Sequence, residues 1–259
     1  MTRIGIIGAG GFVGSAFVRQ AAAAEFEVVP ITRENHEAHL GSAFDILVDA
    51  AGNSKKYLAD EDPEEDFRRS VDHRLRTLLS FRADVHLHVS SVDVYEDLTS
   101  PATTREDRVI DGPRSSSRYG FHKLLAEDLV RHYAKEWLIV RLAGMVGPEL
   151  RKNPVFDVLH DRPLRIHPDS RYQYMLTDDA ARISLRLVSD GVRREAINVC
   201  GSGVISPKQI ADLAGRTMDL RELPSTAVPR VVEASVEKLA GRGFSVDTTE
   251  TIRSFVNAE

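Results

Sequence analysis

A cluster of glycines directly after the first apolar segment constrains this chain more than any other feature. Residues 3–7 are mostly β-branched and apolar, the glycines follow at once, and a helical pattern runs from Phe12 to Ala24. This order predicts a strand, a tight turn and a helix. Glycine adopts positive φ in such a turn and lets a diphosphate approach the amides at the helix N-terminus. We expect cofactor contacts from these residues of the segment: Gly8, Gly11, Phe12, Val13 and Gly14. The alternative interpretation is a glycine-rich turn that binds no ligand.

The rest of the chain alternates between strand-like and helix-like segments. Strands are predicted over residues 27–31, 44–51, 85–90, 137–142 and 197–199, and further helices over 63–81 and 116–135. Such alternation favours a right-handed, doubly wound α/β fold with a mostly parallel Rossmann sheet. We expect this domain over residues 1–147, with 174–200 returning to it, and a small C-terminal substrate-binding lobe over 148–259.

Two short segments carry separate expectations. The span 33–44 is too short for a normal helical crossover between parallel strands, which predicts a shortened sheet edge and a reduced adenine pocket. The acidic run from Asp60 to Asp66 is expected to be a solvated helix start, where the helix dipole favours negative charge.

Composition narrows the functional class. A formal net charge of -5 implies no basic surface for nucleic acid. The single cysteine, Cys200, rules out an internal disulfide and a cysteine metal cage, and no apolar run approaches the length of a membrane span. His86 and His88 share one face of a predicted strand, but we identify no third ligand for a metal. A metal-free, cytoplasmic protein is expected.

The residue after the second predicted strand bears on cofactor choice. An acidic residue there would bind the adenosine ribose hydroxyls, whereas an arginine suits a 2′-phosphate. Thr32 and Arg33 occupy this place. NADP is therefore the expected cofactor, with NAD as the alternative, unless Arg33 is merely a solvated loop residue.

Three polar residues follow in an order that indicates proton-transfer chemistry. Ser91 ends a predicted strand, at the edge where open α/β sheets bind ligands. Tyr119 and Lys123 lie four residues apart on a predicted helix and therefore share a face. A nearby ammonium group should lower the pKa of the tyrosine, which could then exchange a proton with a carbonyl oxygen. An accidental helical pair is the alternative interpretation.

At these positions the sequence resembles the extended short-chain dehydrogenase/reductases, the NAD-dependent epimerase/dehydratase family. Besides the glycine turn and the three polar residues, the similar segments are 45–52, 90–95, 141–148, Asp179, 198–201 and 238–241. The resemblance implies that Tyr119 is the general acid/base, that Lys123 binds the nicotinamide ribose and tunes Tyr119, and that Ser91 holds the reacting oxygen. It also implies cofactor contacts at Ala50, Ala51, Gly52, Leu142 and Ala143.

The sequence departs from this family at informative places. Dehydratases of the family carry Asp then Glu after the catalytic hydroxyl residue; Val92 and Asp93 stand here, which argues against loss of water. Cys200 is far from the serine strand, so the cysteine-dependent GDP-sugar mechanism of some members is unsupported. Gly144 replaces an asparagine that contacts the sugar diphosphate in the family. Candidate substrate contacts are Asp93, Arg171 and Gln173.

The functional expectation is an NADP-linked ketoreductase that acts on a sugar-like carbonyl, including one carried by a nucleotide. The compact chain favours one hydride transfer over the rotation that a sugar C4-epimerase requires. A nucleotide-sugar epimerase and a catalytically silent NADP sensor remain alternatives. The helices predicted over 63–81 and 116–135 resemble the pair that forms a four-helix interface in this family, which implies a homodimer.

Overall fold

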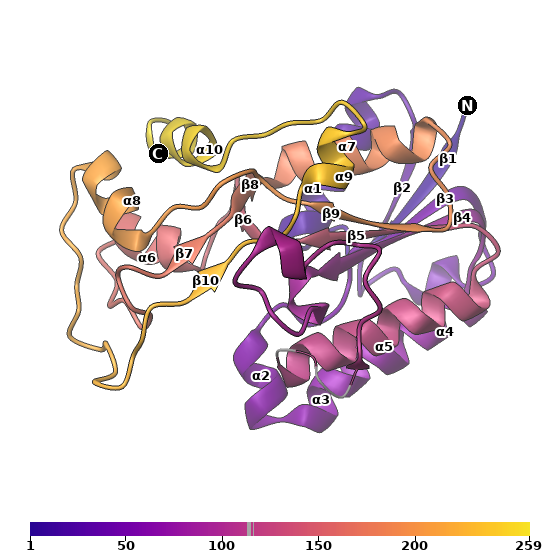
Figure 1. Ribbon diagram of the computed structural model, residues 1–259. Coiled ribbons are helices and arrows are strands. Elements are labelled where there is room, and N and C mark those ends of the chain that lie inside the picture. Colours follow the sequence, from indigo (N-terminus) through magenta and orange to yellow (C-terminus); the bar gives the residue numbers. More distant parts are fainter. Residues whose placement is uncertain (113–114, 116) are drawn as a thin grey trace.

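Six parallel strands form the centre of the molecule (Figure 1). The computed structural model describes residues 1–112, 115 and 117–259. The sheet order is β2-β1-β3-β4-β5-β9, and every neighbouring pair is parallel. The strands are β1 (Arg3–Ile7), β2 (Glu27–Ile31), β3 (Ala43–Asp49), β4 (Arg82–Ser91), β5 (Trp137–Leu142) and β9 (Glu195–Val199). The predicted doubly wound Rossmann sheet is thereby confirmed.

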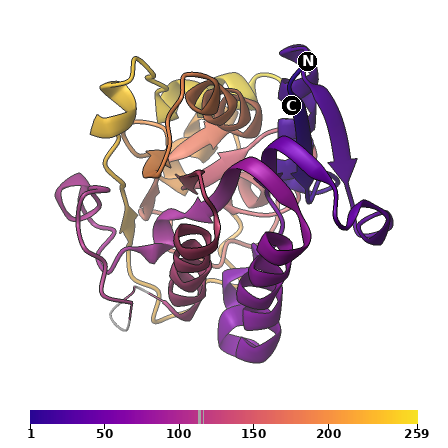
Figure 2. The ribbon, with the colours of Figure 1, turned by 90° about the vertical axis from the view of Figure 1, so that its right-hand side faces the viewer.

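Helices cover both faces of this sheet (Figures 1 and 2). One face carries α1 (Phe12–Ala23) and α7 (Thr177–Ser189), which pack against each other. The opposite face carries α3 (Pro63–Phe67), α4 (His73–Ser80) and α5 (Arg118–Tyr133), with α2 (Lys56–Glu61) beside them. The helix predicted over 63–81 is interrupted by a π-helical turn at Arg68–Asp72, and Ser116, the predicted first residue of α5, lies outside the described residues.

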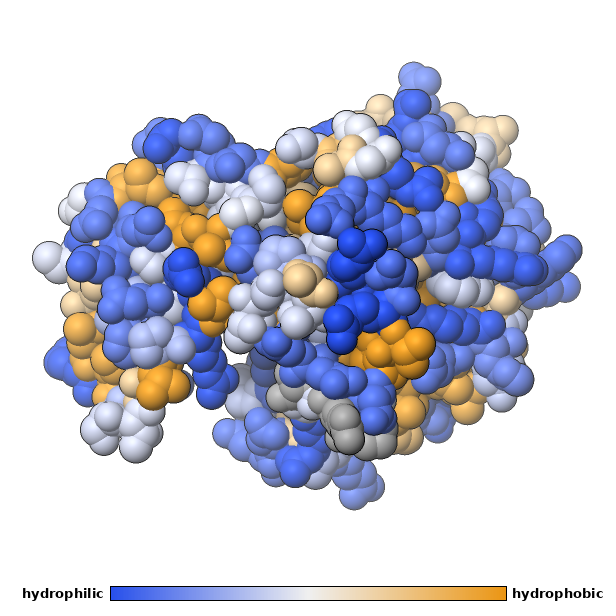
Figure 3. All heavy atoms as spheres, viewed as in Figure 1, coloured by the Kyte–Doolittle hydropathy of each residue, from blue (hydrophilic) through white to orange (hydrophobic). Residues whose placement is uncertain are grey.

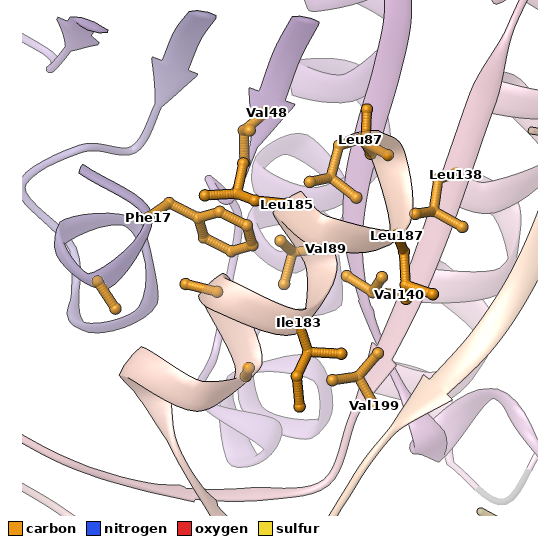
Figure 4. Packing of buried hydrophobic residues seen from close by; sticks show 14 of the residues in the cluster. Phe17, Val48, Leu87, Val89, Leu138, Val140, Ile183, Leu185, Leu187 and Val199 are labelled. Carbon is orange, nitrogen blue, oxygen red and sulfur yellow. The ribbon is translucent and has the colours of Figure 1, made fainter. Parts of the chain in front are cut away.

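The larger apolar core lies between the sheet and α1 with α7. Phe17 of α1 and Ile183 and Leu187 of α7 point towards the strands (Figure 4). They meet strand residues that are almost fully buried, among them Val48, Leu87, Leu138, Val140 and Val199. Strands covered on both faces are expected to be nearly continuous in apolar residues, which explains the valine- and leucine-rich segments that predicted them.

A second, smaller lobe follows the fifth strand of the sheet. It contains short parallel pairs, β6 (Gly144–Val146) with β8 (Tyr174–Leu176) and β7 (Arg171–Tyr172) with β10 (Val231–Val232). Its helices are α6 (Pro154–Leu159), α8 (Pro207–Ala214) and α10 (Thr248–Val256), while α9 (Glu237–Ala240) packs near β9. A separate apolar cluster that includes Val155, Ile210 and Ile252 stabilises it. We propose the boundary near residue 147, with α7 and β9 returning to the first domain.

The edge of the sheet beyond β2 is short, as predicted. Between β2 and β3 the chain forms only a 3-10 turn at Glu37–His39. Within the described residues, β2 has a hydrogen-bonded strand neighbour on one side alone. Among the described helices, none is both long and apolar enough to cross a membrane.

A buried ion pair ties α5 to the sheet. Glu127 is fully buried, and its two carboxylate oxygens accept hydrogen bonds from Nε and Nη2 of Arg141, at 2.9 and 2.7 Å. Ser90 Oγ and Arg131 Nη2 donate to the same carboxylate, at 2.6 and 2.7 Å. Burial opposes ionisation of Glu127 most strongly, yet Arg141, Arg131 and Ser90 together hold its pKa below the usual value. This carboxylate therefore fixes α5 against both β4 and β5.

Candidate active site

The glycine turn joins β1 to α1 with little room on its inner side. Gly8 has a φ of 81°, and its amide donates to Ile31 O at 3.0 Å. A Cβ at Gly14 would lie 2.0 Å from Gly8 O, so only glycine lets α1 pack on the turn. Gly10 has nothing within 4 Å of the position its Cβ would take, so the outer side is open. A turn closed inwards and open outwards fits the diphosphate of a dinucleotide at the N-terminus of α1, beside Phe12 and Val13.

The structure brings Ser91, Tyr119 and Lys123 together. Ser91 is the last residue of β4, while Tyr119 and Lys123 lie in the first turns of α5 and are each 7% exposed. The Lys123 ammonium group lies 5.5 Å from the centroid of the Tyr119 ring. The Tyr119 hydroxyl donates to Asn53 O at 3.4 Å, and the hydroxyl of Ser91 lies near enough to lower its pKa. An acid, a second hydroxyl and a cation therefore meet at the carboxyl end of the sheet.

Gly120 sets the distance between these residues, and the sequence analysis missed it. A Cβ at Gly120 would lie 1.9 Å from Asp93 O, so a larger residue would push α5 away from the segment after Ser91. Ser117 caps the helix, because its Oγ accepts from the amide of Gly120 at 3.0 Å. A serine three residues before the bonded amide is a recognisable N-cap signal. The close approach at Gly120 depends on tertiary packing and has no such signal.

The expected lowering of the Tyr119 pKa is wrong for this structure. Burial raises the pKa of Tyr119 well above its ordinary value, and the carboxylates of Asp93 and Asp66 raise it further. The hydrogen bond with Ser91 lowers it only in part. The sequence revealed the neighbouring lysine but neither the burial nor the two carboxylates. Tyr119 is therefore held as a neutral phenol, the form that donates a proton.

Burial also disfavours the charged form of Lys123. It lowers the pKa of Lys123 from 10.5 to about 8, and the guanidinium of Arg74 lowers it as well. Arg74, in α4, is buried and forms an ion pair with Asp49, which ends β3. The same carboxylate accepts from the amide of Ala51 at 3.0 Å.

The cofactor residues predicted after β3 lie beside this lysine. A Cβ at Gly52 would lie 3.5 Å from Lys123 Nζ, and Gly52 has a φ of 127°. Ala50 and Ala51 precede it at the end of the strand and are half-buried. A nicotinamide ribose over Gly52 would thus be within reach of Lys123.

One carboxylate of the acidic run is not solvated, contrary to expectation. Asp66, in α3, is fully buried where this helix meets α5. Its oxygens contact His122 Nδ1 and Asn53 Nδ2, both at 2.7 Å. Asp62 does follow the prediction, because it caps α3 through the amide of Glu65. The buried Asp66 holds the loop whose carbonyl at Asn53 contacts Tyr119.

The remaining predicted residues are more dispersed. Leu142 ends β5 and is buried, and Ala143 follows it half-buried. Arg33 is exposed just after β2, and Arg171 is exposed on β7. Gln173 differs from its expected role in substrate contact, because it is 1% exposed and its amide bonds both the N–H and the C=O of Ala234. It braces the chain near β10 instead.

The departure at Gly144 has a packing cause. A Cβ there would lie 2.5 Å from Gln173 O and 2.7 Å from the ring of Tyr174. Tyr174 is 2% exposed, so its ring fills the space beside the strand. An asparagine would not fit without a shift of β8. Within the described residues, no group of three histidine, cysteine or acidic side chains is arranged to hold a metal ion.

Comparisons with known proteins agree with this arrangement. The model of the NAD dependent epimerase/dehydratase family matches residues 4–200. A UDP-galactose 4-epimerase structure has a TM-score of 0.79 and 22% identity, over 98% of this chain and 97% of that chain. UDP-glucuronic acid 4-epimerase from Bacillus cereus, bound to UDP-glucuronic acid and NAD, has a TM-score of 0.80 and 17% identity, over 98% of each chain. dTDP-4-dehydrorhamnose reductase from Bacillus anthracis, bound to NADP, has a TM-score of 0.78 and 16% identity, over 100% of this chain and 98% of that chain. No curated protein matches the chain in sequence.

Replacing Lys123 should stabilise the ligand-free protein. Its pKa falls on folding from 10.5 to about 8, so below pH 8 the folded state carries a buried charge that the unfolded state solvates. Lys123→Met should therefore raise the free energy of unfolding at pH 7 by about 3 kcal/mol. The gain should shrink between pH 8 and 10.5, where the unfolded wild-type chain binds more protons than the folded one. Urea unfolding at several pH values measures this. Lys135→Met, at an exposed site beyond α5, is the control; a destabilised Lys123→Met protein would contradict the prediction.

Proposed function

The chain belongs to the NAD dependent epimerase/dehydratase family, and from this premise we propose that it is an NADPH-dependent reductase of a sugar-like carbonyl compound. The observation that carries the proposal is the buried phenol of Tyr119, kept protonated beside the hydroxyl of Ser91. A carbonyl oxygen that gains negative charge needs a proton donor and a second hydrogen bond. Tyr119 and Ser91 can supply both from neighbouring elements.

Each part of the site has a separate task in this proposal. A bound nicotinamide dinucleotide would supply the hydride. The turn from Gly8 to Gly14 would bind its diphosphate, and Arg33 would pair with a 2′-phosphate. Lys123 would hold the ribose, since its ammonium lies next to Gly52. Tyr119 would then donate its proton to the substrate oxygen while Ser91 orients that oxygen.

We place the substrate between the two lobes. Figure 3 shows a notch at the lower edge of the molecule between the small lobe and the rest. Lys152 of the small lobe donates to O and Oγ of Ser54, at 2.6 and 3.1 Å, and so links the lobe to the loop after β3. Asp93 lies next to Ser91 on the catalytic side, and Arg171 would bind a phosphate or carboxylate of the substrate.

Packing at Gly144 argues against the usual contact with a nucleotide-sugar diphosphate, and the compact chain favours reduction over epimerisation. The ring of Tyr174 fills the space in which this family places an asparagine against the sugar diphosphate. The solved structures of similar fold include both epimerases and a reductase, so the fold does not separate the two activities. Assays separate them: a reductase consumes NADPH with its substrate, whereas an epimerase interconverts sugars with no net consumption.

Loss of the Tyr119 hydroxyl should abolish most of the turnover. Tyr119→Phe keeps the ring and its packing but removes the proton donor, so kcat should fall by at least about 10²-fold. The assay follows NADPH oxidation against keto-sugars, nucleotide-linked keto-sugars and simple ketones. NADPH affinity should stay near the wild-type value. Tyr133→Phe, on the same helix but 48% exposed, is the control.

The mechanism is wrong if Tyr119→Phe retains full activity on a substrate that the wild type reduces. A wild-type protein that binds NADPH tightly but turns over nothing in the panel would favour the silent sensor. Sugar interconversion without loss of NADPH would favour the epimerase.

Cofactor preference should depend on Arg33. A hydrogen bond to a charged group contributes about 1.5 to 3 kcal/mol, so Arg33→Ala should weaken NADPH binding roughly ten- to a hundred-fold. NADH lacks the 2′-phosphate and should bind almost as before. Titration calorimetry with both cofactors tests this in one protein, with NADH as the internal control. Equal losses for the two cofactors would refute the role of Arg33.

We also propose a homodimer formed through α4 and α5. These helices lie side by side on one face of the sheet (Figures 1 and 2). Large apolar side chains on these helices and on α3 are exposed: Phe67 at 43%, Leu79 at 67% and Tyr133 at 48%. Exposed apolar groups on two adjacent helices suit a two-fold interface. Sedimentation at micromolar concentration should show a dimer, and Leu79→Asp should shift it towards monomer. A wild-type protein that sediments only as a monomer would exclude this assembly.

A further inference from the structure

We propose that the proton donated by Tyr119 is replaced from solvent through Ser91, Asp93 and Lys56. This inference rests on the proposed reductase function and assigns roles to two residues that do not themselves act on the substrate. Lys56, at the start of α2, was not singled out by its sequence. Asp93 was expected to contact the substrate, and here it serves as a relay and positioning residue behind Ser91.

A continuous series of short contacts supports the route. Ser91 Oγ donates to Asp93 Oδ2 at 2.7 Å, and the other carboxylate oxygen, Oδ1, accepts from Lys56 Nζ at 2.7 Å. The Ser91 hydroxyl also lies close enough to Tyr119 to lower the pKa of its phenol. The two hydroxyls can both donate and accept, the Asp93 carboxylate can accept a proton, and the Lys56 ammonium can release one. Ser91, Asp93 and Lys56 are therefore joined by direct hydrogen bonds, and Tyr119 adjoins Ser91.

The exposure of the side chains shows which end of the proposed proton route meets solvent. Tyr119 is 7% exposed and the Asp93 side chain 8%, whereas the Lys56 side chain is 60% exposed. The other hydrogen-bond contact of the Tyr119 hydroxyl, the carbonyl of Asn53, accepts a hydrogen bond but has no proton to supply. Lys123 is as buried as Tyr119 itself. Lys56 is thus the cation of this series that reaches solvent.

Local structure holds Asp93 in place. The chain turns directly after β4 in a short 3-10 helix, Val92–Val94, and Ser91 Oγ accepts from the amide of Asp93 at 3.2 Å. This turn brings the carboxylate two residues further on back to the serine hydroxyl. Gly120 then allows α5 to contact the same turn, because nothing larger fits against Asp93 O. Tyr119, the neighbour of Gly120, is positioned by that contact.

The proposed proton transfers balance with solvent as the proton source and with no further reactant besides the reduced cofactor. As the Tyr119 O–H bond breaks, the substrate O–H bond forms, and the phenolate takes the proton of Ser91. The Lys56 ammonium passes a proton to the Asp93 carboxylate, Asp93 passes one to Ser91, and the neutral amine is reprotonated by water. One solvent proton is consumed for each carbonyl reduced, and the hydride comes from the reduced cofactor that the proposed function requires. Oxidation of the alcohol runs through the same groups in reverse.

Substitutions at Lys56 distinguish a role in proton transfer from an effect of its positive charge alone. Lys56→Met removes both, whereas Lys56→Arg retains a positive charge but does not release a proton at neutral pH. Both variants should lower kcat, on the order of 10²-fold for positioned proton transfer, with NADPH affinity unchanged. The substrate is the ketone or keto-sugar that the wild type reduces fastest. Lys55→Met is the matched control, because Lys55 faces the ring of Tyr57 at 5.9 Å.

Two further readouts exclude a purely structural effect. The solvent deuterium isotope effect on kcat should rise in Lys56→Met, because the slowed proton step limits turnover. Added methylammonium should restore part of the kcat of Lys56→Ala, since a free amine can replace the missing group, and should not affect the wild type. Asp93→Asn, which keeps a hydrogen-bond acceptor for Ser91 but cannot carry the proton, should be as slow as Lys56→Met.

The relay alone is overturned if the wild type reduces its substrate and Lys56→Met does so equally fast. It is also overturned if Lys56→Arg restores wild-type turnover, because Lys56 would then act through charge only. A wild-type chain that binds NADPH but reduces nothing in the panel overturns the proposed function, and the relay with it.

Discussion

The buried ion pair of Glu127 and Arg141 is the interaction on which the rest of the site depends. Glu127 lies one turn after Lys123 on α5, and its carboxylate binds Arg141 of β5 and Ser90 of β4 at once. Ser90 directly precedes Ser91. One buried carboxylate therefore fixes α5, which carries Tyr119 and Lys123, relative to β4, which ends at Ser91. Removing one partner of a buried pair leaves an uncompensated charge, commonly at a loss of 3–5 kcal/mol, so this attachment tolerates little movement.

The network continues from this pair into the second lobe. Arg141 Nη1 donates to the Tyr95 hydroxyl at 2.8 Å, and that hydroxyl donates to Asn198 Oδ1 at 2.9 Å. The Asn198 amide donates to Thr104 O and Ser235 O, at 2.8 and 3.0 Å. The helix, the sheet and the segments that approach the small lobe thus share one set of buried hydrogen bonds. Such a network makes the relative position of Ser91, Tyr119 and Lys123 a property of the whole fold.

The folded site disfavours the ionised forms of its own tyrosine and lysine. Burial raises the pKa of Tyr119 and lowers that of Lys123 to about 8, so the charged form of each group is disfavoured. Asp93 and Asp66 oppose a phenolate, whereas Arg74 opposes the Lys123 ammonium and the carboxylates of Asp66, Asp93 and Glu127 only partly offset this and burial. These groups stay in place because packing at Gly120 and the ion pair of Glu127 hold α5 there. Stability given up at a site in this way is typical of residues kept for chemistry.

The sequence by itself determined the parallel α/β fold, the glycine turn and the set formed by Ser91, Tyr119 and Lys123, because each rests on a local pattern. Alternating apolar segments, glycines after a strand and side chains four apart on a helix are visible without long-range contacts. Only the tertiary structure decided that Asp66 is buried, that Gln173 braces Ala234 and that Asp93 joins Ser91 to Lys56. It also reversed the expected direction of the Tyr119 pKa. Burial and electrostatic environment are sums over residues far apart in the chain, and they acquire a value only when the chain has folded.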